Sequence, residues 1–148
     1  MSGTGEEAAA EARRWIGTPY RHQASVRGAG ADCLGLLRGV WRALHGHEPE
    51  LIPAYTPDWG EAGADERLWR ALARHMPGKP LEQAAPGDVI LFRMRARAVA
   101  KHVGLQAGVG ANASFVHAYS GHGVVESPQS GPWTRRIVAR FEFPGRRT

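Results

Sequence analysis

The residue best suited to nucleophilic chemistry is Cys33, the only cysteine among 148 residues. Asp32 precedes it and an apolar run follows it, so Asp32 is expected to cap a helix whose first turn contains Cys33. The partial positive charge at a helix N-terminus favours a thiolate over a thiol. The sequence therefore predicts a thiol that can act as a nucleophile if a base lies beside it.

Two of the seven histidines, His102 and His117, lie inside predicted strands over residues 101–107 and 114–119. If residues 108–111 form the tip of a hairpin, the two histidines are directly opposite each other on one face. Their Cβ atoms would then be about 4.5–5.5 Å apart. A shift of one residue would place them on opposite faces, so the prediction depends on register. A facing pair of this kind suits a base and a second group that orients it.

Three interpretations of these residues remain open at this point. The cysteine and the histidines can be a nucleophile with its base, or simply packed side chains, since an isolated cysteine on an apolar helix face is usually a core residue. The third possibility is a zinc site of one cysteine and two histidines. The other histidines are explained by a loop, by helix ends and by a glycine turn: His22, His45, His47, His75 and His122.

The order of helical and strand-like patterns indicates an α+β fold. Apolar periodicity predicts helices over residues 5–16, 33–45 and 61–76, with an extended, proline-rich connection at 48–58. After residue 87 the period becomes that of strands. We expect about five short strands: 88–94, 101–107, 114–119, 123–127 and 137–143. Helices first and strands later favour N-terminal helices packed on an antiparallel sheet. The length favours one domain over residues 1–148.

Composition excludes several classes of function. The formal charge is +5, but the arginines are spread along the chain and no basic stripe with interleaved aromatics occurs, which argues against a nucleic-acid partner. A solvated basic surface is the simpler explanation. The apolar runs are too short to cross a bilayer, so no membrane insertion is expected. The N-terminus lacks a basic region followed by an apolar stretch, so we expect synthesis in the cytoplasm without a signal peptide.

Five short motifs occur in a fixed order along the chain. They are G-T-P-Y-R at 17–21, A-D-C-L-G-L at 31–36, P-G-D-V-I-L-F at 86–92, K-H-V-G-L at 101–105 and F-V-H-A at 115–118. Together they resemble the bacterial NlpC-type cell-wall cysteine peptidases, and the resemblance spans residues 13–127. The Y-R-H-Q loop at 20–23 and the insert before the P-G-D strand resemble the branch found in phage tails and gene transfer particles.

The resemblance implies a papain-like core with assigned roles. Cys33 would be the nucleophile, His102 the general base and later the general acid, and His117 the residue that orients His102. The Tyr20 hydroxyl and the backbone N–H of Cys33 would stabilise the oxyanion. The loop before the helix would supply Arg21, His22 and Asp32 to the substrate.

The implied reaction is hydrolysis of peptidoglycan stem peptides, at the γ-D-glutamyl–diaminopimelate bond, through a thioester acyl-enzyme. The resemblance implies no metal and no organic cofactor. The implied partners are peptidoglycan and the tail or baseplate proteins of a phage-like particle, which would carry the protein to the periplasm or cell wall.

The chain departs from the family pattern in two places. Leu34 stands where a serine usually follows the cysteine, and the loop at 20–31 lacks the usual Trp-Gly-Gly. These departures keep a second interpretation open: an inactive tail-tip component or peptidoglycan-binding module with the same fold.

Overall fold

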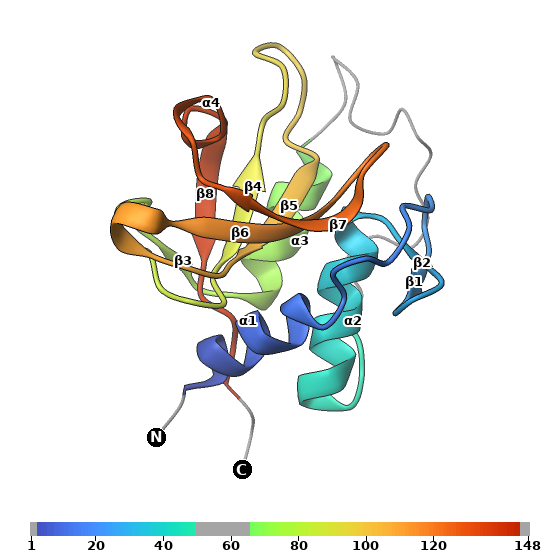
Figure 1. Ribbon diagram of the computed structural model, residues 1–148. Helices are drawn as coiled ribbons and strands as arrows, with labels where there is room; N and C mark the ends of the chain where they lie inside the picture. Colours follow the sequence, from blue (N-terminus) through green and yellow to red (C-terminus); the bar gives the residue numbers. More distant parts are fainter. Residues whose placement is uncertain (1–2, 50–65, 146–148) are drawn as a thin grey trace.

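The computed structural model describes residues 3–49 and 66–145. Within them, two N-terminal helices pack against one side of a six-stranded sheet (Figure 1). The helices are α1 (Thr4–Arg13), α2 (Cys33–His45), α3 (Arg67–His75), α4 (Gly131–Thr134) and the 3₁₀ turn η1 (Gly110–Asn112). The predicted α+β class is confirmed.

The main sheet is antiparallel, with the strand order β3-β8-β4-β5-β6-β7. Its strands are β3 (Gly78–Lys79), β4 (Val89–Phe92), β5 (His102–Gln106), β6 (Ser114–Tyr119), β7 (Gly123–Pro128) and β8 (Ile137–Phe141). A separate two-stranded ribbon, β1 (Ser25–Val26) with β2 (Gly30–Ala31), lies in the loop that leads to α2.

Helix α2 has the boundaries that the sequence predicts. The Asp32 side chain accepts a hydrogen bond from the Gly35 N–H at 2.7 Å, which caps the first turn. Gly46 ends the helix in the left-handed conformation, with φ at 80°. Gly39 leaves space for the Trp15 ring, which follows α1, because a Cβ at position 39 would overlap it. Cys33 is thereby held at a rigid and well-defined helix end.

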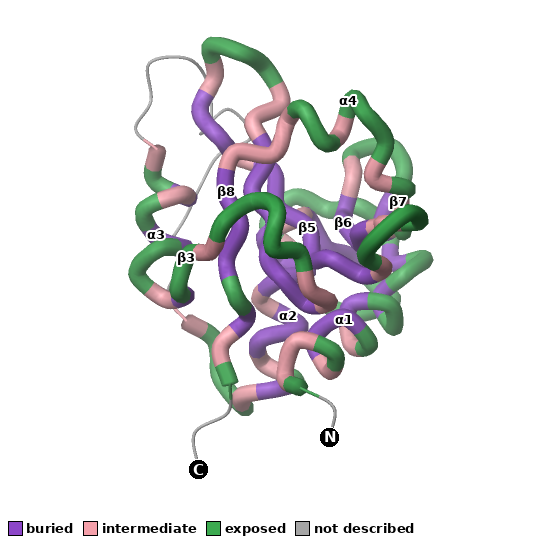
Figure 2. The backbone as a smooth tube through the Cα atoms, turned by 90° about the vertical axis from the view of Figure 1, so that its left-hand side faces the viewer, coloured by how far each residue is buried: buried purple, intermediate pink, exposed green. Residues whose placement is uncertain are grey.

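The sheet buries side chains on both faces, and the buried backbone is concentrated in its central strands (Figure 2). One face packs against the helices and contributes to the larger apolar core, with Val103, Leu105, Val116 and Ala118 among its members. The opposite face forms a smaller cluster around Ile90, Phe92 and Phe115, which Trp133 of α4 partly covers. His102 lies opposite Phe92 in the ladder and therefore projects from the second face.

Several sequence predictions need correction. The main sheet has six strands instead of five, because residues 78–79 pair with the end of β8 where only a helix stop was expected. The short helix α4 and the β1–β2 ribbon were not expected at all. The first helix is shorter than predicted and ends at Arg13. The third begins at Arg67, and residues 61–65, like most of the 48–58 connection, lie outside the described residues.

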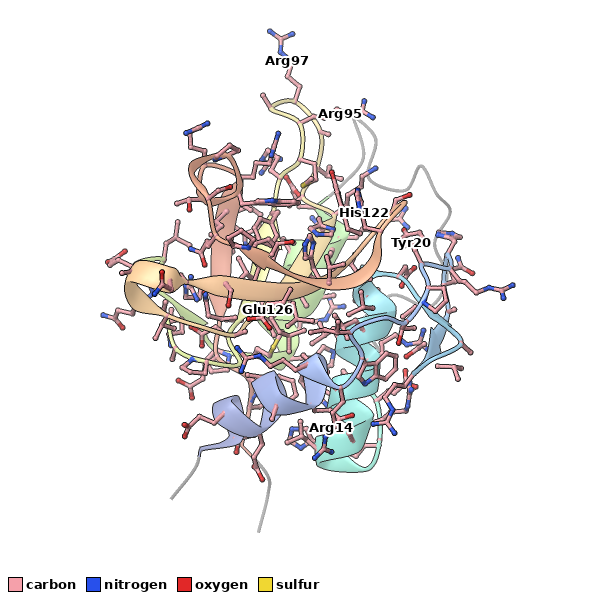
Figure 3. The ribbon with its side chains drawn as sticks, in the orientation of Figure 1. Arg14, Tyr20, Arg95, Arg97, His122 and Glu126 are labelled. Carbon is pink, nitrogen blue, oxygen red and sulfur yellow. The ribbon has the colours of Figure 1, made fainter. Side chains whose placement is uncertain are left out.

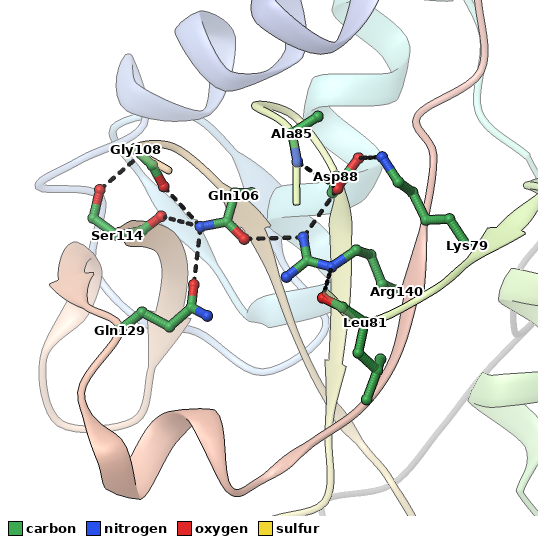
Figure 4. Close-up of polar contacts among 9 residues, drawn as sticks. All are labelled: Lys79, Leu81, Ala85, Asp88, Gln106, Gly108, Ser114, Gln129 and Arg140. Carbon is green, nitrogen blue, oxygen red and sulfur yellow. Dashed lines mark hydrogen bonds and ion pairs between the residues drawn. The ribbon is translucent and has the colours of Figure 1, made fainter. Parts of the chain in front are cut away.

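A buried polar network ties the strands together on the side away from the cysteine (Figure 4). The Arg140 guanidinium donates to the Asp88 carboxylate at 2.9 Å and to the Gln106 side-chain carbonyl at 3.0 Å. Lys79 also contacts the Asp88 carboxylate, at 3.2 Å. The Gln106 side-chain amide donates to Gln129 and to two backbone carbonyls. The aspartate of the P-G-D motif thus links β3, β4, β5 and β8.

Replacing Arg140 with methionine should destabilise the fold by about 3 kcal/mol. The change removes the guanidinium that pairs with the buried Asp88 carboxylate and leaves Lys79 as its charged partner. The matched control is Arg13→Met, which breaks an exposed ion pair with Glu126 and should cost less than about 1 kcal/mol. Urea unfolding of both variants measures the difference. Equal losses would contradict a structural role for the buried network.

Candidate active site

A pocket of about 400 Å³ opens between the N-terminus of α2, the start of β5 and the end of β6. Its size is typical of a small-molecule or peptide site. Five of the seven site residues expected from the sequence lie in its wall. The complete lining is Tyr20, His22, Asp32, Cys33, Leu34, Met94, Lys101, His102, Ala118, Tyr119 and Ser120.

Cys33 is the first residue of α2 and is partly exposed in the pocket. Its thiol donates a hydrogen bond to the backbone carbonyl of Lys101, with Sγ and O 3.5 Å apart. Burial of the sulfur, and the negative charge of Asp32 beside it, raise the pKa of the Cys33 thiol to about 12. Burial of the sulfur therefore opposes the effect of the helix end, which favours the thiolate.

His102 and His117 form a direct hydrogen bond, with Nε2 of His102 and Nδ1 of His117 2.8 Å apart. The predicted register is wrong by two residues, since the ladder pairs Leu105 with Val116. A shift of two residues is one full period of a strand, so both histidines still project from the same face. They meet as diagonal neighbours instead of directly opposite residues.

Gly104 explains how the two imidazoles come so close. A Cβ at this position would lie 3.0 Å from the Phe115 ring and 3.3 Å from the His117 Cβ. The glycine of the K-H-V-G-L motif therefore leaves space for the side chains of β6. The same strand, β5, therefore contains both His102 and the glycine that makes space for His117.

The surroundings of the pair keep both imidazoles neutral. Burial, together with His117, lowers the pKa of His102 to about 3. Burial, together with His122, lowers the pKa of His117 to about 4. Both shifts follow from the low polarity around the rings, which disfavours the imidazolium.

Trp133 of α4 packs over the pair and was missed by sequence reasoning. Its ring centroid lies 5.0 Å from that of His117 and 5.8 Å from that of His102. Phe92 and Phe115 complete the apolar surroundings, with centroids 5.5 Å from His102 and 4.4 Å from His117. The residues around Trp133 in the sequence do not indicate that it belongs to the site. It reaches the histidines only because the chain folds back over the sheet after β7.

Ser127 was also missed as a member of the site. Its Oγ lies 2.8 Å from Nε2 of His117, the ring nitrogen that does not face His102. The sequence did place residue 127 in a predicted strand. The alternation of that strand could have identified the serine, but only if its register with β6 had been known.

Tyr20 and His22 lie in the pocket wall, whereas Arg21 is not among its lining residues. The Arg21 side chain instead covers Gly30, where a Cβ would collide with it. Burial, and the charges of Cys33 and Asp32, raise the pKa of Tyr20 to about 12. Tyr20 therefore keeps its proton at neutral pH and can donate a hydrogen bond into the pocket.

Asp32 shapes the pocket from its buried position at the start of α2. One carboxylate oxygen caps the helix, and the other accepts a hydrogen bond from the Gln23 N–H at 2.7 Å. Gln23 has a positive φ of 63°, an uncommon conformation for a residue with a side chain. Asp32 also lies 3.9 Å from the His22 imidazole. The carboxylate therefore fixes the loop that forms one wall of the pocket.

Leu34 directly follows Cys33, where the resemblance leads us to expect a serine. It is buried and belongs to the main apolar core while also lining the pocket. The departure seen in the sequence thus exchanges a polar group for an apolar part of the wall. Cys33 and His102 still line the pocket, and His102 still contacts His117.

The described residues do not bring together a metal site. Within 3–49 and 66–145, no three histidine, cysteine, aspartate or glutamate side chains are grouped so that they could hold an ion. Nε2 of His102 and Nδ1 of His117 face each other instead of a common point. In the same residues, no helix is long and apolar enough to span a membrane.

The site therefore presents a thiol, two imidazoles and a hydroxyl. Hydrogen bonds join His102 to His117 and His117 to Ser127. Among the described residues, Nδ1 of His102 has no hydrogen-bond partner, so it is the nitrogen left to take a proton. A thiol, a neutral base and a group that orients the base are the elements of nucleophilic catalysis.

Comparison with known proteins identifies the fold. The sequence model of the NlpC/P60 family matches residues 17–142. The chain is 21% identical to the NlpC/p60 domain of the peptidoglycan hydrolase SagA, with a TM-score of 0.65 over 94% of this chain and 98% of that one. No curated protein matches the sequence.

Two longer proteins are also similar in structure. NlpC1 from Trichomonas vaginalis has a TM-score of 0.64 and 21% identity, over 95% of this chain and 44% of that one. An NlpC/P60 family protein from Bacillus cereus has a TM-score of 0.63 and 18% identity, over 92% of this chain and 39% of that one. These structures share the mixed α+β, papain-like fold. The match over most of the chain shows that this protein belongs to the NlpC/P60 family.

Proposed function

We propose that this protein is a cysteine peptidase that hydrolyses peptidoglycan stem peptides at the γ-D-glutamyl–diaminopimelate bond. The observation that carries the proposal is the pocket that Cys33 and His102 both line, with Nε2 of His102 2.8 Å from Nδ1 of His117. Membership of the NlpC/P60 family and the likeness to the domain of a peptidoglycan hydrolase support the same chemistry.

In the first step, Nδ1 of His102 takes the proton of the Cys33 thiol while the sulfur attacks the peptide carbonyl carbon. The resulting oxyanion is stabilised by hydrogen bonds from the Tyr20 hydroxyl and the Cys33 backbone N–H. The imidazolium of His102 is stabilised by its hydrogen bond to His117. Breakage of the C–N bond then releases the amine, which receives the proton from His102, and leaves a thioester on Cys33.

In the second step, His102 takes a proton from water as the water oxygen attacks the thioester carbonyl. Breakage of the C–S bond releases the carboxyl product and returns the proton to the Cys33 sulfur. Burial raises the pKa of Cys33 and lowers that of His102, and both shifts favour the uncharged groups before substrate binds. Charge therefore develops only during the reaction, where the hydrogen bonds to the oxyanion and to His102 stabilise it.

The charge around the pocket suits an acidic peptide. Lys101 lies in the pocket wall, which also contains the buried side chain of Asp32. Arg95 and Arg97 are exposed on the loop between β4 and β5 (Figure 3). Peptidoglycan stem peptides carry free carboxylates, and cationic groups attract them to the site.

The setting that we propose is a phage-like tail or gene transfer particle, in which tail or baseplate proteins would be the partners. The loop at 20–23 supports this setting, because it departs from the usual family sequence in the same way as the phage-associated branch. Delivery within a particle would bring the enzyme to the periplasm or cell wall.

A second candidate function is a peptidoglycan-binding or tail-tip component without turnover. One observation favours it: the thiol of Cys33 donates to the Lys101 carbonyl and has its pKa raised to about 12. Such a thiol is unreactive unless substrate binding brings it into contact with His102. Activity and thiol titration together separate the two functions.

Replacing Cys33 with alanine should reduce the release of peptides from purified peptidoglycan at least about a thousandfold, because no other group in the site can form the thioester. Mass spectrometry of the products identifies the bond that is cut. The control is Ser120→Ala, which changes another pocket residue and should retain most of the activity. Undiminished digestion by Cys33→Ala, with an unchanged melting temperature, would rule out the proposed nucleophile.

The rate of Cys33 alkylation by iodoacetamide should rise about tenfold per pH unit from pH 7 to pH 9, without a plateau, because only the thiolate reacts. The raised pKa of about 12 favours the neutral thiol across this range. The same chain in urea serves as control and should level off near the ordinary pKa of about 8.5.

A plateau with a midpoint below pH 7 in the folded protein would instead reveal a thiolate–imidazolium pair and contradict the neutral resting state. A high thiol pKa together with hydrolysis fits the proposed peptidase. A high thiol pKa without any hydrolysis fits the binding module.

A further inference from the structure

We propose that Ser127 is a positioning residue that accepts a hydrogen bond from His117 and thereby leaves the pocket-facing nitrogen of His102 free to act as the base. The inference rests on the proposed function, since it concerns the proton that His102 must accept. Ser127 does not line the pocket. It acts through the two histidines and not on the substrate.

The sheet places Ser127 next to His117. Ser127 pairs with Phe115 across the β6–β7 ladder, and His117 pairs with Val125 two residues further on. The alternation of strands therefore puts the serine and the histidine on the same face as diagonal neighbours. The outcome is the 2.8 Å contact between Ser127 Oγ and His117 Nε2.

The neighbouring residue on β7 holds this strand in place. The Glu126 carboxylate accepts two hydrogen bonds from Arg13, each at 3.0 Å, and one from the Ser114 hydroxyl at 2.7 Å. In Figure 3 the Glu126 label lies between the sheet and α1. β7 is thus fixed to a helix on one side and to β6 on the other.

Two arrangements of protons satisfy the contacts among His102, His117 and Ser127. They differ in whether Nδ1 of His102, which faces the pocket, carries a proton. If Ser127 accepts, His117 carries its proton on Nε2 and accepts from the Nε2–H of His102, so Nδ1 of His102 keeps its lone pair. If Ser127 donates, both histidines carry their protons on Nδ1, and His102 presents an N–H to the pocket. Only the first arrangement allows His102 to take the thiol proton.

Ser127 can accept a hydrogen bond from His117 because its own hydroxyl proton can be donated to solvent. The residue is half-buried at the exposed edge strand of the sheet. Among the described residues, no acceptor receives the Ser127 hydroxyl proton, so solvent can take it. A side chain without a hydroxyl would leave the His117 N–H buried and unpaired in the active arrangement, which costs more than an unpaired lone pair.

Threonine and valine at position 127 test this role, because their side chains have the same shape and differ only in the hydroxyl. Both suit a strand. Ser127→Thr should keep kcat within about threefold of the wild type. Ser127→Val should lower kcat roughly tenfold to a hundredfold. KM should stay unchanged in both variants, because Ser127 lies outside the pocket.

The tautomers of His102 and His117 can be measured without an activity assay. Long-range ¹H–¹⁵N spectra of protein labelled at histidine distinguish the protonated nitrogen from the bare one in each ring. At pH 7 the wild type and Ser127→Thr should carry the His102 proton on Nε2. Ser127→Val should shift His102 toward the Nδ1–H form.

Three outcomes would overturn the proposal: a His102 that carries its proton on Nδ1 in the wild type, a Ser127→Val variant with the wild-type tautomer, or a Ser127→Val variant with the wild-type kcat. If valine prevents folding, as a thermal melt would reveal, Ser127→Ala replaces it in both measurements. A wild-type protein that cleaves no peptidoglycan fragment would refute the proposed function, whereas the tautomer measurement would still decide the role of Ser127.

Discussion

The hydrogen bond between the two buried imidazoles is the contact on which the site depends. It is 2.8 Å long and lies among aromatic side chains, with His117 fully buried and His102 8% exposed. The low polarity there keeps His102 and His117 neutral, and it strengthens every hydrogen bond made in the site. Gly104 provides the space, and Trp133 of α4 provides the cover.

The rest of the fold brings a thiol to these rings. α2 packs against the other face of the sheet, and its capped N-terminus reaches the point where β5 begins. There the Cys33 thiol meets the carbonyl of Lys101, the residue directly before His102. The acceptor of the thiol hydrogen bond thus lies directly before the first residue of β5, which is His102. The Arg140–Asp88–Gln106 network fixes the strands on the far side of this arrangement.

The electrostatics of the site differ from the thiolate–imidazolium pair that a helix end alone would favour. Burial acts on the thiol and the base in opposite directions on the pKa scale, and both effects favour the uncharged groups. A neutral resting pair protects the thiol from unspecific reaction. In the proposed reaction, the thiolate would therefore form only as the substrate carbonyl is attacked.

Local sequence determined the elements that have strong local signals. The cap at Asp32, the apolar periodicity and the stop at Gly46 define α2 to the residue, because these effects act within one or two turns. The alternation in β5 and β6 was enough to place His102 and His117 on one face, since a shift of two residues leaves the face unchanged. Tertiary structure decided what depends on contacts between distant segments: the true register, the pairing of β3, the cover by Trp133 and the contact of Ser127 with His117. It also set the direction of the pKa shift of Cys33, because desolvation, the largest cause, depends on everything that packs around the sulfur.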